Sequence, residues 1–393
     1  MAASGKYKHQ FRSLLLSSVL ALCFLTFAAM AAPFKAGFDQ CGPSHAFAPN
    51  GSDARFARGF NLPNWDPGYE GYKPDDGLLR QLREMGFSHI RLPVSLESLV
   101  GRYSSKDGIE AQLSALGQMI TRLVALDFAV SVDLLPDQPF QITHKNRPDL
   151  GLAYLVEAWD KIAAISEGWP QESVYFELLN EPIPDQDVWW PQAQTLVHHL
   201  NRIAKGRKLI IGPAVFQRHE VLIASEPLNG ENLVYAIHYY DPFLFTHQAM
   251  TWEEGSAIRF LRQLPFPADA QSPAVVAQIE NMKARGAPDL VRALQETFQQ
   301  PWNAARIATD FAALGQWSKH HKVPVIVNEF GVLDFDVDRR SRINWLRAVR
   351  LAAEKNCIGW AHWDFSDGFA MVNPQTTLPD PFVMDALLSN REK

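Results

Sequence analysis

The sequence predicts a single (β/α)8 barrel, an α/β fold in which eight parallel strands alternate with helices. From residue 59 onward, short apolar runs alternate with longer amphipathic segments, a pattern typical of parallel-sheet proteins. The pattern repeats eight times, and no short hairpin turn interrupts it apart from Asn229-Gly230 in a loop. A chain of 393 residues is long enough for one such barrel.

Each predicted strand is a short run of apolar residues that ends at Gly, Pro or polar residues. Pro93 and Pro182 mark two of these ends, because proline cannot donate a hydrogen bond to a strand ladder. The eight strands are expected at residues 59–62, 88–93, 128–135, 175–181, 208–212, 233–240, 323–329 and 358–364.

Helices are expected where the apolar residues change to helical spacing. The first has Asp75 and Asp76 as capping residues, and Gly86 ends it. The predicted helices cover residues 77–85, 109–126, 152–166, 190–204, 220–224, 302–320, 340–354 and 384–389.

One connection is much longer than the others. The segment from Asp241 to Ala304 follows the sixth strand and contains Pro265, Pro267 and Pro273. Long functional loops are expected at the carboxyl ends of barrel strands, so we interpret this segment as a long loop excursion that walls a cleft. The barrel is then a single domain, residues 59–393, preceded by an N-terminal extension at residues 33–58.

Residues 1–32 have the pattern of a secretory signal peptide. Lys6, Lys8 and Arg12 precede an apolar run at residues 14–30, and Ala29-Met30-Ala31 offers a cleavage site. The sequence therefore predicts a secreted or periplasmic protein with no stable membrane insertion after cleavage. An uncleaved membrane anchor is the alternative, because the run is close to the length that spans a bilayer.

Composition excludes some functions and leaves one pairing open. The net charge of −6 and the pI near 6.1 offer no basic field for nucleic acid. Three cysteines are too few for a disulfide scaffold. Cys23 lies in the leader. Cys41 and Cys357 are either paired in an oxidising compartment or two separate buried thiols. We expect a monomer.

Two predicted strands end in the same way, with Asn-Glu. Glu181 follows Asn180 at the end of the fourth strand, and Glu329 follows Asn328 at the end of the seventh. Two glutamates at the carboxyl ends of barrel strands can face each other across one cleft, which is the arrangement that a glycosidase needs. The alternative is that each is a solvated strand end or a member of a structural ion pair.

Other polar and aromatic residues end the same set of strands. They are Arg91, His238, Tyr240, Trp363 and Asp364. With Asn180, Glu181 and Glu329 they make a set that resembles glycoside hydrolase family 5, the family of many cellulases and mannanases. The resemblance runs from about residue 61 to residue 363. Its motifs are Ile90-Arg91-Leu92-Pro93, Leu179-Asn180-Glu181-Pro182, His238-Tyr239-Tyr240, Asn328-Glu329-Phe330-Gly331, Trp363 and, after the sixth strand, Phe245-Thr246-His247-Gln248.

The resemblance implies hydrolysis with retention, with Glu181 as the acid/base and Glu329 as the nucleophile. It also implies that Asn180 holds the sugar 2-hydroxyl, that His238 lines the same pocket and that Trp363 is a stacking floor. Arg91 and Trp363 could also be structural, the first in a barrel ion pair and the second in the core, and His238 could be a satisfied core histidine.

Physical reasoning supports the division of roles. Arg91 is the nearest plausible cation to Glu329 and should lower the pKa of its carboxyl group, while Tyr240 could donate a hydrogen bond to it. Glu181 must begin protonated, and the second carboxylate in the cavity should raise its pKa. Retention requires the two carboxyl groups to lie about 5–5.5 Å apart.

One position departs from the family pattern. Many members carry a histidine near the end of the third strand, after an Asp-Leu pair. Here Asp133-Leu134 is followed by Leu135-Pro136-Asp137-Gln138. The histidine is absent, and Gln138 is the candidate to take its place.

The sequence thus predicts an exported endo-acting β-1,4-glucanase that acts on a polysaccharide or oligosaccharide with no metal and no cofactor. The same residues suit other β-glycans, namely β-mannan, xyloglucan and β-1,3-glucan, because specificity lies in the loops. A sugar hydroxyl could also replace water, giving transglycosylation. A glycan-binding barrel without activity is the alternative from a different class.

Overall fold

Eight parallel strands close into one barrel in the computed structural model, which describes residues 37–253 and 255–389. The strands follow one another in sequence order around the barrel, and β1 pairs with β8 to close it. They are β1 (Arg58–Asn61), β2 (His89–Ser95), β3 (Ala129–Leu135), β4 (Val174–Glu177), β5 (Leu209–Ile211), β6 (Leu233–Tyr239), β7 (Val325–Phe330) and β8 (Gly359–His362). The predicted fold class is confirmed.

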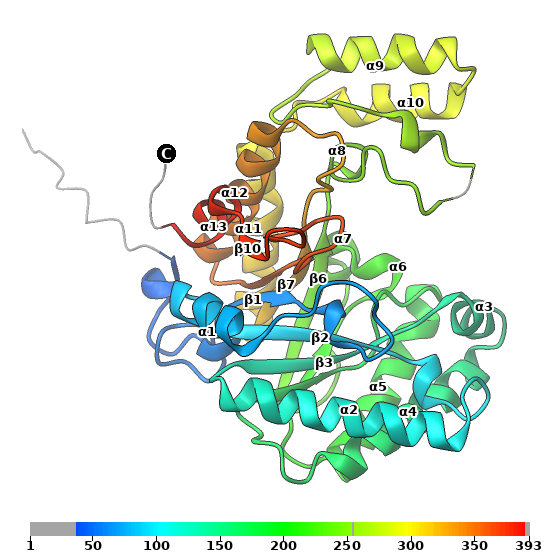
Figure 1. Ribbon diagram of the computed structural model, residues 1–393, viewed down its shortest axis with the longest axis vertical. Helices are drawn as coiled ribbons and strands as arrows, with labels where there is room; N and C mark the ends of the chain where they lie inside the picture. The colour runs from blue at the N-terminus through cyan, green and yellow to red at the C-terminus, as the bar shows by residue number, and fades with distance from the viewer. Residues whose placement is uncertain (1–36, 254, 390–393) are drawn as a thin grey trace, which may run out of the picture. The chain divides into compact units, whose positions relative to one another are not determined.

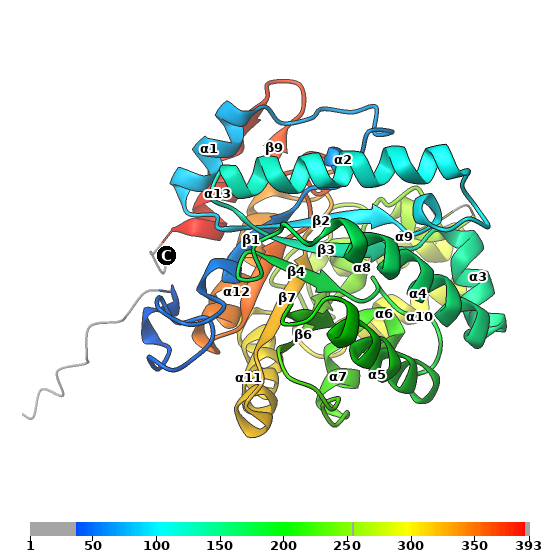
Figure 2. The same cartoon turned by 90° about the horizontal axis from the view of Figure 1, so that it is seen from below.

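Helices alternate with these strands along the chain and lie outside the barrel (Figures 1 and 2). They are α1 (Asp76–Met85), α2 (Lys106–Ala125), α3 (Gln138–Asn146), α4 (Pro148–Ile165), α5 (Gln186–Ile203), α6 (Ala214–Gln217), α7 (His219–Ile223), α8 (Phe243–Thr246), α9 (Pro273–Ala284), α10 (Pro288–Phe298), α11 (Ala304–His321), α12 (Arg339–Lys355) and α13 (Pro381–Leu388). Asp75 caps α1 as predicted, since its side chain accepts from the Leu78 N–H.

The connection after β6 is more ordered than the sequence analysis expected. It contains α8, a 3-10 turn at Ala257–Phe260, and the two antiparallel helices α9 and α10, which extend away from the barrel (Figure 1). Pro273 and Pro288 stand in the first turns of α9 and α10. Our interpretation of the segment as a loop was wrong in this part, because proline also favours the first turn of a helix. Pro139 has the same place in α3, a helix that we did not predict.

Polar side chains fill the middle of the barrel. Along β2, β3 and β4, alternate residues point inward, and these include Arg91, Asp133 and Glu177, all fully buried. A shift of register between β6 and β7 pairs His238 with Glu329 and leaves Asn328 as an extra residue in β7. Because of this bulge, Asn328 and Glu329 both direct polar contacts into the barrel, although they are consecutive in the strand.

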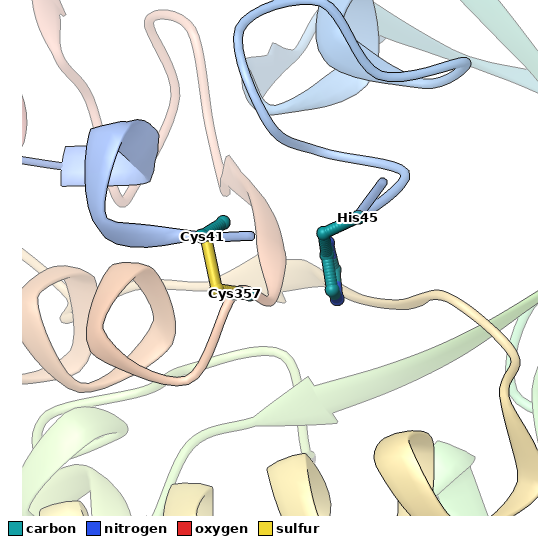
Figure 3. Close-up of side chains that lie close together, drawn as sticks. All are labelled: Cys41, His45 and Cys357. Atoms are coloured by element: carbon teal, nitrogen blue, oxygen red, sulfur yellow. A yellow bond between two sulfur atoms is a disulfide. The ribbon is translucent and has the colours of Figure 1, made fainter. Parts of the chain in front are cut away.

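The segment before β1 packs at the end of the barrel where the strands begin. Cys41 and Cys357 form a disulfide with their Cα atoms 5.8 Å apart, which settles the pairing that the sequence left open (Figure 3). Nearby, Arg58 Nε lies 3.0 Å from Glu354 Oε1. Cys357 lies two residues before β8, so the bond ties the N-terminal segment to the amino end of the last strand.

The leader predicted at residues 1–32 lies outside the described residues, as do residues 33–36 of the predicted N-terminal extension. Among the helices at residues 37–253 and 255–389, none is long and apolar enough to cross a bilayer.

We predict that replacing both Cys41 and Cys357 by alanine destabilises the protein by about 2–4 kcal/mol, because the closed loop restricts the unfolded chain. For a chain of this size the loss corresponds to roughly 3–5 °C in Tm. Thermal unfolding measured by circular dichroism, with and without a thiol reductant, tests it. The reductant should lower the Tm of the wild type and not that of the variant. An unchanged wild-type Tm after verified reduction contradicts the prediction.

Candidate active site

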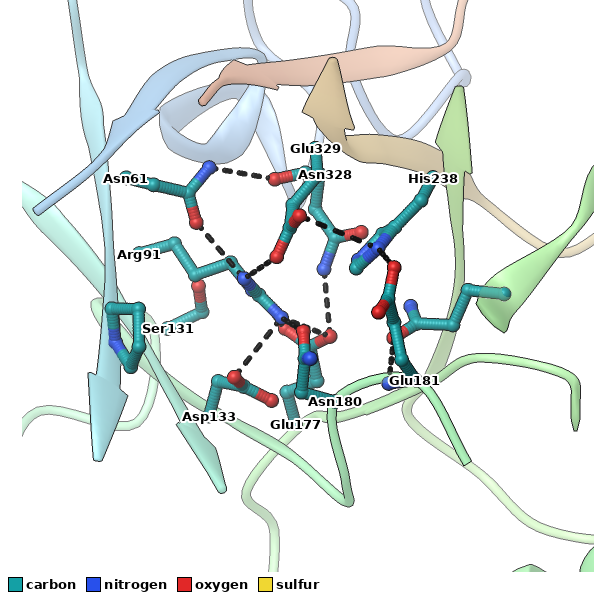
Figure 4. Close-up of polar contacts among 12 residues, drawn as sticks. Asn61, Arg91, Ser131, Asp133, Glu177, Asn180, Glu181, His238, Asn328 and Glu329 are labelled. Carbon is teal, nitrogen blue, oxygen red and sulfur yellow. Dashed lines mark hydrogen bonds and ion pairs between the residues drawn. The ribbon is translucent and has the colours of Figure 1, made fainter. Parts of the chain in front are cut away.

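The carboxyl ends of the strands hold one connected polar cluster (Figure 4). Arg91 comes from β2, His238 from β6 and Glu329 from β7, while Asn180 and Glu181 follow the end of β4. The fourth strand ends at Glu177, earlier than predicted, and Glu181 has a left-handed backbone with φ of 45°. The predicted residues at the ends of strands two, four, six and seven are therefore brought together.

Arg91 is the centre of the cluster and is completely buried. Its Nε and Nη2 donate to the two carboxylate oxygens of Glu177, at 2.7 and 2.9 Å. Its Nη1 donates to Glu329 Oε1 at 2.7 Å. The expected contact between Arg91 and Glu329 is present, and so is the barrel ion pair that we held as its alternative. The guanidinium group of Arg91 has several N–H donors in a fixed planar geometry, so it can make both contacts at once.

The remaining donors of Arg91 orient two amide side chains. Nη1 donates to Asn61 Oδ1 and Nη2 to Asn180 Oδ1, each at 2.9 Å. Burial by itself lowers the pKa of Arg91. The attraction of three nearby carboxyl groups, those of Asp133, Glu177 and Glu329, outweighs this effect, so the pKa lies well above its usual value. The guanidinium therefore keeps its charge at every relevant pH.

Asp133 adds a further carboxyl group to this cluster, with Oδ2 at 3.0 Å from Arg91 Nη2. Its pKa is raised well above the usual value, chiefly by burial, with Glu177 and Glu329 adding to the shift and Arg91 opposing it. A raised pKa favours the neutral form of Asp133, which limits the negative charge that a single buried guanidinium must balance.

Glu329 is held by two donors besides its contact with His238. Arg91 Nη1 binds one carboxylate oxygen, and the Tyr240 hydroxyl donates to the other at 3.0 Å. We expected Arg91 to lower the pKa of Glu329. The net shift is upward instead, because burial outweighs the opposing effects of His238, Arg91 and the Tyr240 hydrogen bond. The pKa of Tyr240 is raised well above its usual value by burial and by Glu329, which keeps its hydroxyl protonated as a donor.

Glu181 has a different environment from Glu329. Its side chain is 28% exposed at the mouth of the cluster, against 7% for Glu329. Protein atoms still displace enough water around it to raise its pKa to about 7, with Arg91 opposing the shift. We expected the second carboxylate to be the cause of the raised pKa. The direction is confirmed, but the cause is burial.

His238 lies between the two glutamates. Its Nδ1 is 2.9 Å from Glu181 Oε1 and 3.4 Å from Glu329 Oε2. Burial lowers its pKa to about 4, with Glu329 opposing the shift, so the ring is neutral at neutral pH. A neutral imidazole whose Nδ1 faces two carboxylates donates its proton there, which makes His238 part of the cluster and not a detached core residue.

Asn180 belongs to the cluster, and Trp363 follows β8, the strand next to β7. Since the Oδ1 of Asn180 accepts from Arg91, its NH2 group is free to donate, and none of the described residues accepts from it. Trp363 directly follows β8 and is partly buried, with its backbone N–H donating to Phe330 O at 2.9 Å. Both positions suit contacts with a ligand above the barrel, and their predicted roles stay predictions.

The candidate for the missing histidine does not join the site. Gln138 is exposed at the first residue of α3. The helix start that follows Pro136 directs the chain outward, so Gln138 does not substitute for a histidine next to the two glutamates.

The sequence analysis assigned no role to five polar residues that contact Arg91, Glu177 or Glu181. These are Asn61, Asp133, Glu177, Asn328 and Gln217. A signal was present for Glu177 and Asp133, since each is an acidic residue inside an otherwise apolar central strand, which requires a buried partner. Arg91 in β2 is that partner for both carboxyl groups.

Three groups of side chains have potential metal ligands within 4.8 Å of one another, among residues 37–253 and 255–389. In the first, Cys41 and Cys357 are joined in the disulfide beside His45 (Figure 3). In the second, Glu220 and Asp241 are paired with Arg218 beside His219. The third is Glu181, His238 and Glu329. In each group, protein partners already use the ligand atoms.

Comparison with known proteins identifies the family. The family described as "Cellulase (glycosyl hydrolase family 5)" matches residues 49–368. The chain belongs to glycosyl hydrolase family 5. Family membership confirms the predicted class of enzyme, an O-glycosyl hydrolase, and the predicted resemblance.

The curated relatives of this family 5 chain are distant. Endoglucanase 3 of Fibrobacter succinogenes is 25% identical over 334 residues, which are 80% of this chain and 50% of that protein. Endoglucanase C of Acetivibrio thermocellus is 25% identical over 331 residues, which are 79% of this chain and 91% of that protein. The chain thus spans about half the length of the first relative and most of the second.

Solved structures agree in fold. A Thermotoga maritima Cel5A structure in complex with mannotriose has a TM-score of 0.67 at 24% identity, covering 86% of this chain and 98% of that one. The clostridial cellulose synthase subunit Z from Clostridioides difficile has a TM-score of 0.67 at 21% identity, covering 84% and 99%.

We predict that Glu177→Gln destabilises the protein by about 3–5 kcal/mol, because it leaves the buried Arg91 without its bidentate carboxylate. Urea unfolding followed by circular dichroism measures the change. Glu280→Gln is the matched control, since Glu280 pairs with Lys283 on the surface and both side chains are more than half exposed. Equal stability of the two variants would show that the buried ion pairs do not support the fold.

Proposed function

We propose that this family 5 enzyme is a retaining, endo-acting β-1,4-glucanase in which Glu181 is the acid/base and Glu329 the nucleophile. The proposal rests on the pair of carboxylates: they have oxygens within 4.8 Å of each other, and Glu181 is more exposed than Glu329. A pair of oxygens this close fits carboxyl groups about 5–5.5 Å apart, as in retaining enzymes, better than the roughly 6.5–9.5 Å of inverting ones.

The first step forms a covalent intermediate. An oxygen of Glu329 attacks the anomeric carbon while the bond from that carbon to the leaving oxygen breaks, and Glu181 gives its proton to that oxygen. Arg91 and Tyr240 hold the attacking carboxylate in place. A pKa of about 7 leaves Glu181 protonated at neutral pH in a useful fraction of molecules.

The second step reverses the roles. Glu181, now ionised, takes a proton from water, and the water oxygen attacks the anomeric carbon as the ester bond to Glu329 breaks. Two inversions give net retention. The free NH2 group of Asn180 is placed to donate to the sugar 2-hydroxyl, a contact that strengthens in the transition state.

Glucan is the preferred substrate because the two curated relatives compared above are named endoglucanases. Aromatic side chains extend from the catalytic cluster: Tyr240 contacts His247 at 4.9 Å between ring centroids, and His247 contacts Trp252 at 6.0 Å. Trp252 is 57% exposed. A row of aromatic rings that leads from the carboxylates to the exposed Trp252 indole suits the apolar faces of a β-linked chain. The enzyme would act as an exported monomer without a cofactor.

We expect that NMR of the first product from cello-oligosaccharides shows the β-anomer before mutarotation, and that Glu329→Gln abolishes turnover. Manno-oligosaccharides run in parallel test the substrate. Cleavage of the manno-series alone would withdraw the glucan assignment and keep the mechanism. The α-anomer as first product, or an active Glu329→Gln, would overturn the mechanism. Failure on every β-glycan, with binding retained, would favour a non-catalytic barrel.

The pH profile of kcat/KM on cello-oligosaccharides should fall above a pKa of about 7, because Glu181 must carry its proton when the glycosidic bond breaks. It should also fall at acid pH, where Glu329 becomes protonated at a pKa above the usual glutamate range. An aryl glycoside with an activated leaving group provides the control, since its first step needs no acid and its alkaline limb should flatten. An alkaline limb that is identical for both substrates would contradict the acid role of Glu181.

A further inference from the structure

The chain after β5 turns through an unusual backbone. Val215, Phe216 and Gln217 are consecutive and have φ values of 56°, 58° and 53°. Residues other than glycine rarely adopt this left-handed region, and a β-branched valine there is an outlier. Such conformations persist only where the surroundings hold them, and they concentrate at functional sites.

Neighbouring elements hold this turn in place. The side chain of Gln186, from α5, accepts the Ala214 N–H at 2.7 Å. The Trp189 indole donates to the carbonyl of Gly212 at 2.9 Å. Gly212 also makes room for Gln217, because a Cβ at residue 212 would lie 2.3 Å from Gln217 Cγ.

The turn delivers the Gln217 side chain to the residue that we propose as the acid. Gln217 is completely buried, and its Oε1 accepts the backbone N–H of Glu181 at 2.9 Å. This is the only side-chain hydrogen bond of Gln217 within the described residues, and its Nε2 is buried without a partner. A buried amide with an unused donor is unfavourable, so the arrangement is not the one that stability alone would select.

The contact bears on the position of the Glu181 carboxyl group. Glu181 lies beyond the end of β4 and has a left-handed φ of 45°, so the ladder of that strand does not hold its backbone. The N–H that Gln217 accepts is therefore a direct restraint on where the side chain begins. From there the carboxylate reaches His238 Nδ1 at 2.9 Å.

We propose that Gln217 is a positioning residue that holds Glu181 in the orientation for proton donation to the leaving oxygen. This inference rests on the proposed function of Glu181. The left-handed turn at residues 215–217 serves to bring this amide into contact with residue 181. Misplacing a catalytic group by about 1 Å costs on the order of 100-fold in rate, so one such contact has a measurable effect.

The test compares leaving groups in Gln217→Met, which keeps the volume of the side chain and removes its acceptor. Substrates are aryl β-cellobiosides with phenols of graded acidity, together with cellotetraose. We expect kcat/KM to fall about 10- to 100-fold for cellotetraose and for cellobiosides of weakly acidic phenols. For the dinitrophenyl cellobioside, whose leaving group departs without a proton, it should fall less than about 3-fold. In Glu181→Ala the loss of kcat/KM should depend on the leaving group in the same direction and more strongly.

Two further variants separate positioning from folding. Gln217→Glu keeps an oxygen that can accept the Glu181 N–H and should restore most of the activity on poor leaving groups. Gly212→Ala leaves Gln217 chemically intact but pushes it aside, and should reproduce the dependence of Gln217→Met. If Gln217→Met does not fold, as judged by its melting curve, Gly212→Ala carries the test.

Gln194→Met is the matched control, since it removes a glutamine oxygen that accepts a backbone N–H, that of Asn229 at 2.7 Å, and contacts neither Glu181 nor the turn at residues 215–217. It should lower the Tm and lower kcat/KM equally for all leaving groups, if at all. Uniform losses in Gln217→Met and Gly212→Ala, or no loss, would overturn the positioning role. A wild type inactive on every aryl cellobioside and on cellotetraose would instead overturn the proposed function.

Discussion

The burial of one guanidinium group organises this protein. Arg91 is completely buried inside the barrel, and an unpaired charge there would cost several kcal/mol. Its bidentate bond to Glu177 fixes the plane of the fork. Every remaining donor then has a set direction, and these directions determine where Glu329 and the amide of Asn180 lie. The position of the proposed nucleophile is thus a consequence of how the barrel balances one buried charge.

The same interior makes the two glutamates unequal. Glu329 is almost fully enclosed and receives donors from a cation and a phenol, whereas Glu181 lies at the exposed edge with a neutral histidine as its side-chain partner. Burial raises the pKa of both and Arg91 opposes the shift in both, but only Glu329 pairs directly with the guanidinium, at 2.7 Å. Two identical side chains can therefore hold different protonation states in one cleft, which is what acid and nucleophile roles require.

Irregular backbone occurs where the chemistry is placed. The bulge at Asn328 lets two consecutive residues of β7 face the interior, which a regular strand would forbid. Glu181 and the segment 215–217 are left-handed at the ends of β4 and β5. In each case the departure directs a polar side chain into the cluster at the carboxyl end of the barrel.

The sequence by itself determined the fold class and which strand ends carry polar groups, because alternation of apolar runs and amphipathic helices is a local property of the chain. It also indicated Arg91, Glu181, His238 and Glu329, since a charged or polar residue at the end of a buried strand is visible in a linear pattern. The sequence analysis was wrong where one residue type is compatible with two structures. Pro273 begins α9, although a proline is also common in loops. Only the tertiary structure decided the Cys41–Cys357 bond, the roles of Glu177 and Asp133 beneath the site, and the contact of Gln217 with Glu181. The net pKa shift of Glu329 belongs to the same class, because burial and pair distances depend on residues far apart in the chain and outweigh what any one neighbour suggests.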